Sequence, residues 1–177
     1  MSIKLTYFVH WTTPDNEQAL ASGHNDIHLS KLWIQQAKEL WELRKDNFDI
    51  VITSDLTRAI DTAKLAFSDR CMHLQDERLR ECDYGELTQK KKNWSNEKYV
   101  NSIYPNGESY MGVEMRIKEL LEWLKKNYEG KHVAFVAHQA PQLALDVLIK
   151  NMSWKEAIKK DWRNTKDWQP GWEYLIK

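Results

Sequence analysis

The chain is poor in cysteine and has no long apolar run. Its 177 residues include two cysteines, Cys71 and Cys82, too few for the disulfide framework of a small secreted domain. No apolar stretch approaches the roughly 18 residues that a membrane-spanning helix needs, and the first residues do not resemble a signal peptide. We therefore expect a soluble, cytoplasmic protein with no membrane partner.

An excess of charge of either sign is also missing. Lysine and arginine together number 26, as do aspartate and glutamate, so the formal net charge is zero. General nucleic-acid binders usually carry a basic excess, so we expect no nucleic-acid partner, although the balance does not exclude a local basic pocket. A chain of this length fits one domain and buries roughly 70% of its unfolded surface, so it needs no disulfides or structural metal for stability. We expect a single domain over residues 1–177.

Short apolar runs alternate with helical patterns along the chain. Strands are expected at residues 6–9, 49–53, 71–75, 132–137 and 172–176. Helices are expected at residues 56–67, 109–128 and 141–149, and after Ser30, where Trp33, Ala37, Leu40, Trp41 and Arg44 follow at helical spacing. This alternation favours an α/β fold with three α/β/α layers around a mostly parallel central sheet.

Three segments lack a clear period. Residues 15–29 are expected to form a long loop, which in a compact domain often signals function. Residues 86–108 are polar and lysine-rich, and we expect a small cap-like excursion in which Lys90-Lys91-Lys92 is a solvated run or, alternatively, attracts an anionic substrate. The tryptophan-rich tail is expected to pack, or alternatively to close over a site together with Arg163; its tryptophans are Trp154, Trp162, Trp168 and Trp172.

Polar residues follow three of the predicted strands. His10 ends the first, Ser54-Asp55 and Arg58 follow the second, and His138 follows the strand at 132–137, directly before a helix. Ligands of parallel α/β sheets bind at the carboxyl ends of the strands. A helix start also offers backbone N–H groups and a positive dipole end, which suit an anion. The two histidines, the arginine and the helix start therefore predict phosphate chemistry.

These residue types allow a metal-independent mechanism. A neutral imidazole can attack phosphorus, while Arg58 and a protonated His138 hold the negative oxygens. The leaving alkoxide needs a proton, for which Glu81 is the best candidate, with Asp83 or Glu86 as alternatives. His24 and His28 flank Asp26 in a loop rather than on a helix, so we expect no metal site and no cofactor.

Several ordered segments together resemble the histidine phosphatase superfamily, also called phosphoglycerate mutase-like. Residues 10–16 are similar to the family's Arg-His-Gly-x-Thr-x-x-Asn, and residues 53–63 to its Ser-x-Leu-x-Arg-Ala-x-x-Thr-Ala. Further matches are the Gly23–Ser30 run with Gln36-Ala37, the acid-bearing Leu79–Gly85 segment, the Pro105–Ser109 turn and Ala137-His138. The resemblance covers nearly the whole chain and implies a phosphoglycerate mutase-like fold.

The resemblance also implies the role of each matching residue. His10 would be the phosphorylated nucleophile and Glu81 the proton donor, while Arg58 and His138 would hold the phosphoryl group. The remaining expected contacts to phosphate or substrate are Thr13, Asn16, Ser22, Gly23 and Gln139.

The chain departs from the family's pattern at two motifs, beside His10 and after His138, where Gln139-Ala140-Pro141 stands in place of the usual glycines. Val9 stands where an arginine normally precedes the nucleophile, and Trp11 replaces the glycine after it. Losing one charged contact to phosphate costs about 1.5–3 kcal/mol, or roughly 10- to 200-fold in binding. The sequence therefore predicts a weaker or differently built phosphate pocket, in which another cation takes over.

The favoured hypothesis is a metal-independent phosphomonoesterase that acts on a small phosphorylated substrate. A phosphoglycerate mutase-type phosphoryl transferase is disfavoured, because the segment between Gly85 and Pro105 is short for a mutase. A catalytically weak regulatory module that binds a phospho-ligand is the third hypothesis, and Val9 and Trp11 favour it. The sequence leaves a homodimer open.

Overall fold

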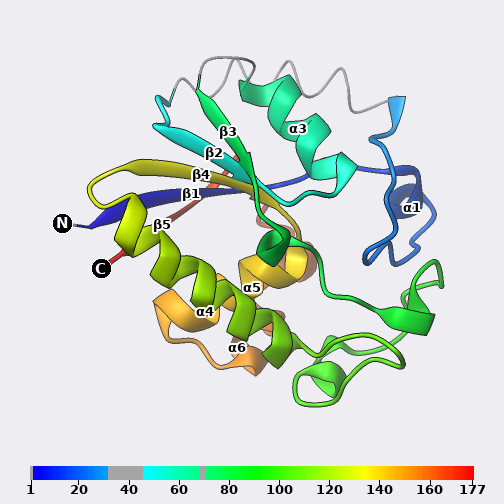
Figure 1. Cartoon of the computed structure of the whole chain (residues 1–177). Coiled ribbons are helices and arrows are strands. Elements are labelled where there is room, and N and C mark those ends of the chain that lie inside the picture. The colour runs from blue at the N-terminus through cyan, green and yellow to red at the C-terminus, as the bar shows by residue number, and fades with distance from the viewer. Residues whose placement is uncertain (1, 32–45, 68–70) are drawn as a thin grey trace.

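A five-stranded sheet forms the centre of the molecule (Figure 1). The computed structural model describes residues 2–31, 46–67 and 71–177. The strand order is β3-β2-β4-β1-β5, and every pair is parallel except that β5 runs antiparallel to β1. The strands are β1 (Ile3–Val9), β2 (Ile50–Thr53), β3 (Met72–Gln75), β4 (His132–Ala137) and β5 (Trp172–Ile176). The predicted mostly parallel sheet is confirmed.

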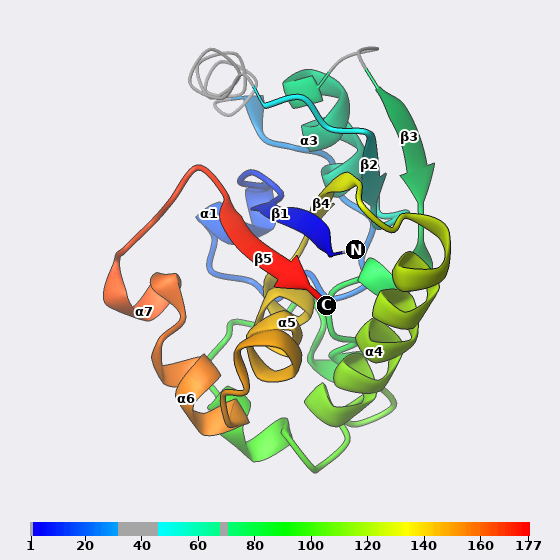
Figure 2. The same ribbon diagram turned by 90° about the vertical axis from the view of Figure 1, so that its left-hand side faces the viewer.

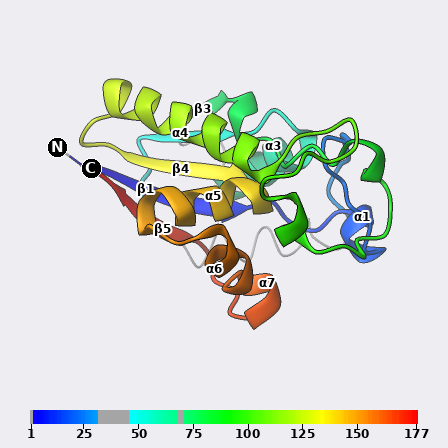
Figure 3. The same ribbon diagram turned by 90° about the horizontal axis from the view of Figure 1, so that it is seen from below.

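Side chains alternate between the two faces of the sheet, as the period of two in a strand requires. In β1, Leu5 and Tyr7 join the larger core, while Phe8 joins a smaller one on the opposite face. The larger core lies under α4 (Tyr110–Asn127) and α5 (Gln139–Lys150), which lie side by side in Figure 3, and the smaller under α3 (Thr57–Phe67). The three predicted layers are present.

Hydroxyl and carboxylate caps begin several helices. The Ser109 hydroxyl accepts the backbone N–H of Gly112 and so begins α4, as predicted. Thr13 caps α1 (Pro14–Glu17), so the expected loop through residues 15–29 is wrong at its start. The helix expected after Ser30 lies outside the described residues.

The C-terminal tail leaves the sheet and then returns to it (Figure 2). It carries α6 (Trp154–Lys159) and α7 (Trp162–Thr165), and then forms the edge strand β5. A capping box between Ser153 and Glu156 begins α6, and the Asp161 side chain caps α7. The tail thereby places α7 on the side of the molecule where β1 ends.

The segment expected to be a cap-like excursion, residues 86–108, is mostly irregular chain. It contains the 3₁₀ turn Asn96–Tyr99, and a second 3₁₀ turn, Gly85–Leu87, overlaps its start. The segment is fixed to residues 19–21 by backbone hydrogen bonds and a bridge between Leu20 and Lys91. Its inner side is an aromatic cluster made by Tyr84, Trp94, Tyr99, Tyr104 and Tyr110. In the part of the chain that the structure describes, no helix is both long and apolar enough to cross a membrane.

Candidate active site

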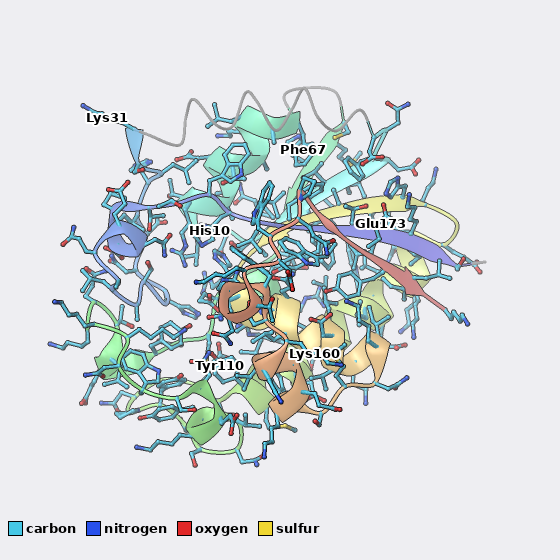
Figure 4. All side chains as sticks on the ribbon, turned by 180° about the vertical axis from the view of Figure 1, so that it is seen from behind. His10, Lys31, Phe67, Tyr110, Lys160 and Glu173 are labelled. Carbon is cyan, nitrogen blue, oxygen red and sulfur yellow. The ribbon has the colours of Figure 1, made fainter. Side chains whose placement is uncertain are left out.

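The two predicted histidines meet at the carboxyl ends of β1 and β4. The backbone N–H of His10 donates to the carbonyl of Ala137 at 2.9 Å, which continues the β1–β4 ladder by one residue. The ring centroids of His10 and His138 are 4.9 Å apart. Figure 4 shows His10 at the end of its strand. Two residues that are remote in sequence thus form one site, as the sequence predicts.

Hydrogen bonds define which nitrogen of His10 carries the proton. Nδ1 lies 2.7 Å from the carbonyl oxygen of Trp11 and can only donate to it, while the Arg58 Nε–H donates to Nε2 at 3.3 Å. Desolvation, and then the charge of Arg58, lower the pKa of His10 to about 3. At neutral pH the ring is therefore uncharged, with its lone pair on Nε2.

Arg58 is a buried cation, with 1% of its surface exposed. It donates from NH1 to the carbonyl of Asn25 at 2.8 Å and from NH2 to the carbonyl of Gly23 at 2.7 Å. No carboxylate lies within salt-bridge distance of it among the described residues. Burial lowers its pKa, but an arginine stays protonated. A buried charge that lacks an ionic partner is costly, so this corner favours an anion.

His138 is fully buried behind His10 and is held on both sides. Its Nε2 lies 2.6 Å from the Ser54 hydroxyl, and the Tyr7 hydroxyl bonds both its backbone N–H (2.9 Å) and its carbonyl (2.6 Å). Burial first, and then the charge of Arg58, lower its pKa well below the usual value. Burial therefore favours the uncharged ring in this structure, whereas the sequence suggested a protonated His138. Its Nδ1 is buried and has no hydrogen-bond partner among the described residues.

Glu81 occupies the start of α5. Its Oε1 accepts the backbone N–H groups of Cys82 and Ala140, both at 2.9 Å, and its Oε2 accepts that of Gln139 at 3.1 Å. The helix start predicted as an open anion site is thus already filled by a carboxylate of the protein. Because the Glu81 oxygens accept N–H groups that the first turn of α5 would otherwise leave unpaired, Glu81 is fixed firmly in place.

Arg116 supports the Glu81 segment from α4. It donates to the carbonyl of Glu81 at 3.1 Å and to that of Arg78, and pairs with Glu108 at 2.8 Å. Glu108 in turn accepts the backbone N–H of Asp83 at 3.0 Å. Sequence reasoning missed Arg116, because a polar residue within an amphipathic helix carries no signal that separates it from a solvated one.

The remaining predicted contacts divide into two groups. Asn16, Ser22, Gly23 and Gln139 line the same cavity as His10, and the Ser22 hydroxyl is buried without a partner among the described residues. Thr13 is fully buried and caps α1 through Asn16, so the described cavity wall does not include it. Its contribution is to the shape of the loop after His10.

The cavity has a volume of about 840 Å³, large enough for a small organic molecule. Among the described residues, Lys92 and Arg163 line it as further cations besides Arg58. Lys92 of the lysine run and the tail residues Trp162, Arg163 and Trp168 thus lie at the cavity, where the second alternative for each segment places them. The aromatic side chains Trp11, Tyr84, Trp162 and Trp168 are part of the described wall. Trp154 packs in the core instead.

The histidines of the 24–28 loop have separate partners. His24 Nε2 lies 2.8 Å from the carbonyl oxygen of Glu81, whereas His28 Nδ1 lies 3.1 Å from the Asp61 carboxylate. Within the described ranges no group of three His, Cys, Asp or Glu side chains is arranged to hold a metal ion.

Comparison with known proteins identifies the family. A sequence model of the histidine phosphatase superfamily (branch 1) matches residues 9–167. This chain belongs to the histidine phosphatase superfamily. Within that superfamily it is 33% identical over 148 residues to a Bacillus subtilis protein named "Uncharacterized phosphatase PhoE", a match that covers 81% of this chain and 74% of that one.

Two further superfamily members illustrate the range of the likeness. The chain is 38% identical over 104 residues to a 2,3-bisphosphoglycerate-dependent phosphoglycerate mutase of Streptococcus mutans, covering 55% of this chain and 45% of the mutase. The crystal structure of the alpha-ribazole phosphatase from Shigella flexneri superposes with a TM-score of 0.75 at 26% identity, covering 87% of this chain and 83% of that one. Relatives in this superfamily are phosphatases or mutases, which supports an enzyme.

Proposed function

We propose that this protein is a phosphomonoesterase that works through a covalent phosphohistidine at His10 and needs no metal. The observation that carries the proposal is the His10–Arg58 pair. A neutral imidazole presents a lone pair on Nε2, 3.3 Å from a buried guanidinium that has no carboxylate partner among the described residues. A nucleophile and a cation for the phosphoryl oxygens thus lie side by side.

In the first step the Arg58 Nε–H turns from Nε2 of His10 to a phosphoryl oxygen, and the freed lone pair of Nε2 attacks the phosphorus of the monoester. The N–P bond forms as the bond from phosphorus to the leaving oxygen breaks, and Glu81 in its protonated form gives that oxygen its proton. In the second step Glu81 takes a proton from water, which attacks the phosphohistidine, releases phosphate and restores His10. Three backbone N–H groups, from Cys82, Gln139 and Ala140, hold the Glu81 oxygens in place for both steps.

His138 contributes a hydrogen-bond donor. The Ser54 hydroxyl accepts the Leu56 N–H at 3.4 Å and can then donate its own proton to His138 Nε2. That arrangement leaves the ring proton on Nδ1, which has no partner among the described residues. A phosphoryl oxygen would satisfy this donor, so a neutral His138 can also bind the phosphoryl group, through one uncharged hydrogen bond rather than the charged one that the sequence suggested.

The extent of similarity to each kind of relative favours hydrolysis over the transfer of a phosphoryl group between substrates. The match to the Bacillus phosphatase covers 81% of this chain, whereas the match to the Streptococcus mutase covers 55%. The intact pairing of His10, Arg58 and His138 favours an enzyme over a module that only binds.

Turnover of a panel of aryl, alkyl and sugar phosphates in the presence of a chelator tests the proposal. We expect the wild type to release phosphate and His10→Ala to lose at least about a thousandfold of the rate, because the nucleophile is gone. His28→Ala, at an exposed histidine of the rim loop, is the matched control. Isomerisation of a phosphoglycerate, or phosphate binding without hydrolysis, would favour the mutase or the binding module instead.

A further inference from the structure

The cavity has a second basic wall, separate from the corner that Arg58 occupies. Arg58 is bonded to His10 and to the carbonyls of the 23–25 loop. Lys92 and Arg163 also line the cavity but come from the 86–108 segment and from α7. Glu81 is the one carboxylate residue among the described residues that line it.

Both cations are held by one hydrogen-bonded pair. The Gln139 side chain accepts from Lys92 Nζ at 2.9 Å and donates to the Asp161 carboxylate. Asp161, with 5% of its surface exposed, also binds Arg163 NH1 at 2.9 Å. Asp161 thus caps α7 and also pairs with Arg163, and this pair holds the Arg163 side chain toward the cavity.

Aromatic rings set the orientation of the two cations. The Arg163 guanidinium stacks on Trp162, 4.4 Å from the ring centroid, and Trp162 stacks in turn on Trp172. Lys92 Nζ lies 5.3 Å from the Tyr84 ring centroid. The Trp162 indole N–H is buried and has no partner among the described residues. One unpartnered donor therefore lies next to a fixed guanidinium in the cavity wall.

We propose that Lys92 and Arg163 form a second anion-binding subsite, a proposal that rests on the proposed function. The preferred substrates are then phosphomonoesters that carry a second anionic group, either a carboxylate or a phosphate. The His10–Arg58 corner takes the phosphoryl group that is transferred. The aromatic wall takes the apolar part of the molecule, and the second anion binds between the Lys92 ammonium group and the Arg163 guanidinium in the cavity wall. Taken over all its atoms, Lys92 is an exposed residue. Desolvation of its ammonium group and the charge of Arg163 nevertheless lower the pKa of Lys92, and an anion bound beside it would raise that pKa again.

Two ligands of nearly equal size separate this subsite from the phosphoryl site. They are 4-propylphenyl phosphate and 4-(2-carboxyethyl)phenyl phosphate, which have similar phenol leaving groups and differ in one carboxylate. Their dissociation constants are measured by calorimetry on His10→Ala, which cannot turn them over, and on the same protein with Arg163→Met, Lys92→Met or Lys160→Met. Lys160 is exposed at the end of α6 (Figure 4) and is the control.

We expect His10→Ala to bind the carboxylated ligand about tenfold more tightly or better, since a hydrogen bond to a charged group is worth that much. The ratio of the two constants should fall toward one with Arg163→Met and with Lys92→Met, and persist with Lys160→Met. Arg163→Lys should restore part of the preference for the carboxylated ligand.

Equal affinities for the two ligands in His10→Ala would overturn the proposal. An equal weakening of both ligands by Arg163→Met would also overturn it, because Arg163 would then act on the phosphoryl group. Turnover by the wild type is a separate readout: a binding preference without hydrolysis would support the subsite and contradict the phosphatase, and hydrolysis without a preference would do the reverse.

Discussion

At the scale of single residues, the two departures from the family pattern beside His10 have physical explanations. Trp11 acts through its backbone: its carbonyl accepts the Nδ1–H of His10, and its N–H donates to the Thr62 hydroxyl at 3.1 Å. It has no left-handed backbone conformation, so glycine is not needed there. Val9 lies beside a small apolar hollow that Trp11 and Trp168 also line. The place of the usual arginine is therefore apolar, and in the proposed mechanism Arg58 holds the phosphoryl group.

Replacement of Arg58 tests that assignment. We expect Arg58→Met to weaken binding of vanadate or inorganic phosphate by roughly 10- to 200-fold, because a charged hydrogen-bond donor is lost. Arg58→Lys should recover part of the affinity, since it keeps the charge but not the planar fork. Lys64→Met, on the exposed side of α3, should leave binding as in the wild type. Equal affinity in Arg58→Met would place the anion elsewhere.

At the scale of elements, strand ends and helix starts assemble the site. The Tyr7 hydroxyl on β1 ties the first residue after β4 in place, and Glu81 fills the N-terminus of α5. Apolar alternation predicts these strands, and stripes such as Val113, Ile117 and Leu121 predict α4. The partner of a helix start is not predictable in this way. Glu81 is 59 residues from Ala140, and only the folded chain brings them together.

Tyr7→Phe tests the link between the strands. It removes one buried hydroxyl and leaves the His138 N–H unpaired, so we expect a loss of about 1–3 kcal/mol in the free energy of unfolding. Urea unfolding measures it. Tyr128→Phe, at a half-buried tyrosine beyond α4, is the matched control. An unchanged midpoint for Tyr7→Phe would show that these bonds contribute nothing net.

Glu81→Gln tests the proton donor. An amide lacks the transferable proton, so we expect the loss of rate to be at least about tenfold larger for alkyl phosphates than for 4-nitrophenyl phosphate, whose leaving group needs little protonation. The measurement is kcat for both ester types in wild type and variant. Asp83→Asn, the alternative acid in the same segment, is the control. The same loss for both esters would limit Glu81 to a structural role.

At the scale of the whole molecule, His10, half-buried in the cavity wall, and His138, fully buried, are both neutral in the folded chain. Their folded-state pKa values lie below the ordinary 6.5, about 3 for His10 and well below 6.5 for His138. Between these values and 6.5 the unfolded chain binds more protons than the folded one. Stability is therefore full above pH 6.5 and falls as the pH drops toward 3.

We expect the free energy of unfolding to fall between pH 6.5 and pH 4.5 by up to about 1.4 kcal/mol per pH unit for each histidine. Urea unfolding over this range measures the slope. His10→Asn should make it shallower, whereas His28→Asn, at an exposed position, should not change it. The same slope in His10→Asn and wild type would contradict a neutral, desolvated His10.

The sequence predicts the sheet, the long helices and the residues that follow the strand ends, His10 and His138, because each depends on local periodicity or on the end of a strand. For the outer cavity wall the sequence offers only alternatives, a solvated lysine run or one that attracts an anion, and a tail that packs or one that closes over a site. Lys92 looks like part of a solvated lysine run, and Arg163 is one of many charges in an aperiodic tail. Both reach the cavity because Gln139 and Asp161 meet between α5 and α7. Long-range pairing of that kind leaves no pattern in the sequence.

Trapping the phosphorylated enzyme tests the central claim most directly. The protein is mixed with a rapidly hydrolysed aryl phosphate, quenched in alkaline detergent, and analysed by intact mass and peptide mapping. The account predicts one added phosphoryl group on His10 that is stable to alkali, labile to acid and absent from His10→Ala. Hydrolysis with no phosphoenzyme, or with the phosphoryl group on another residue, would contradict it.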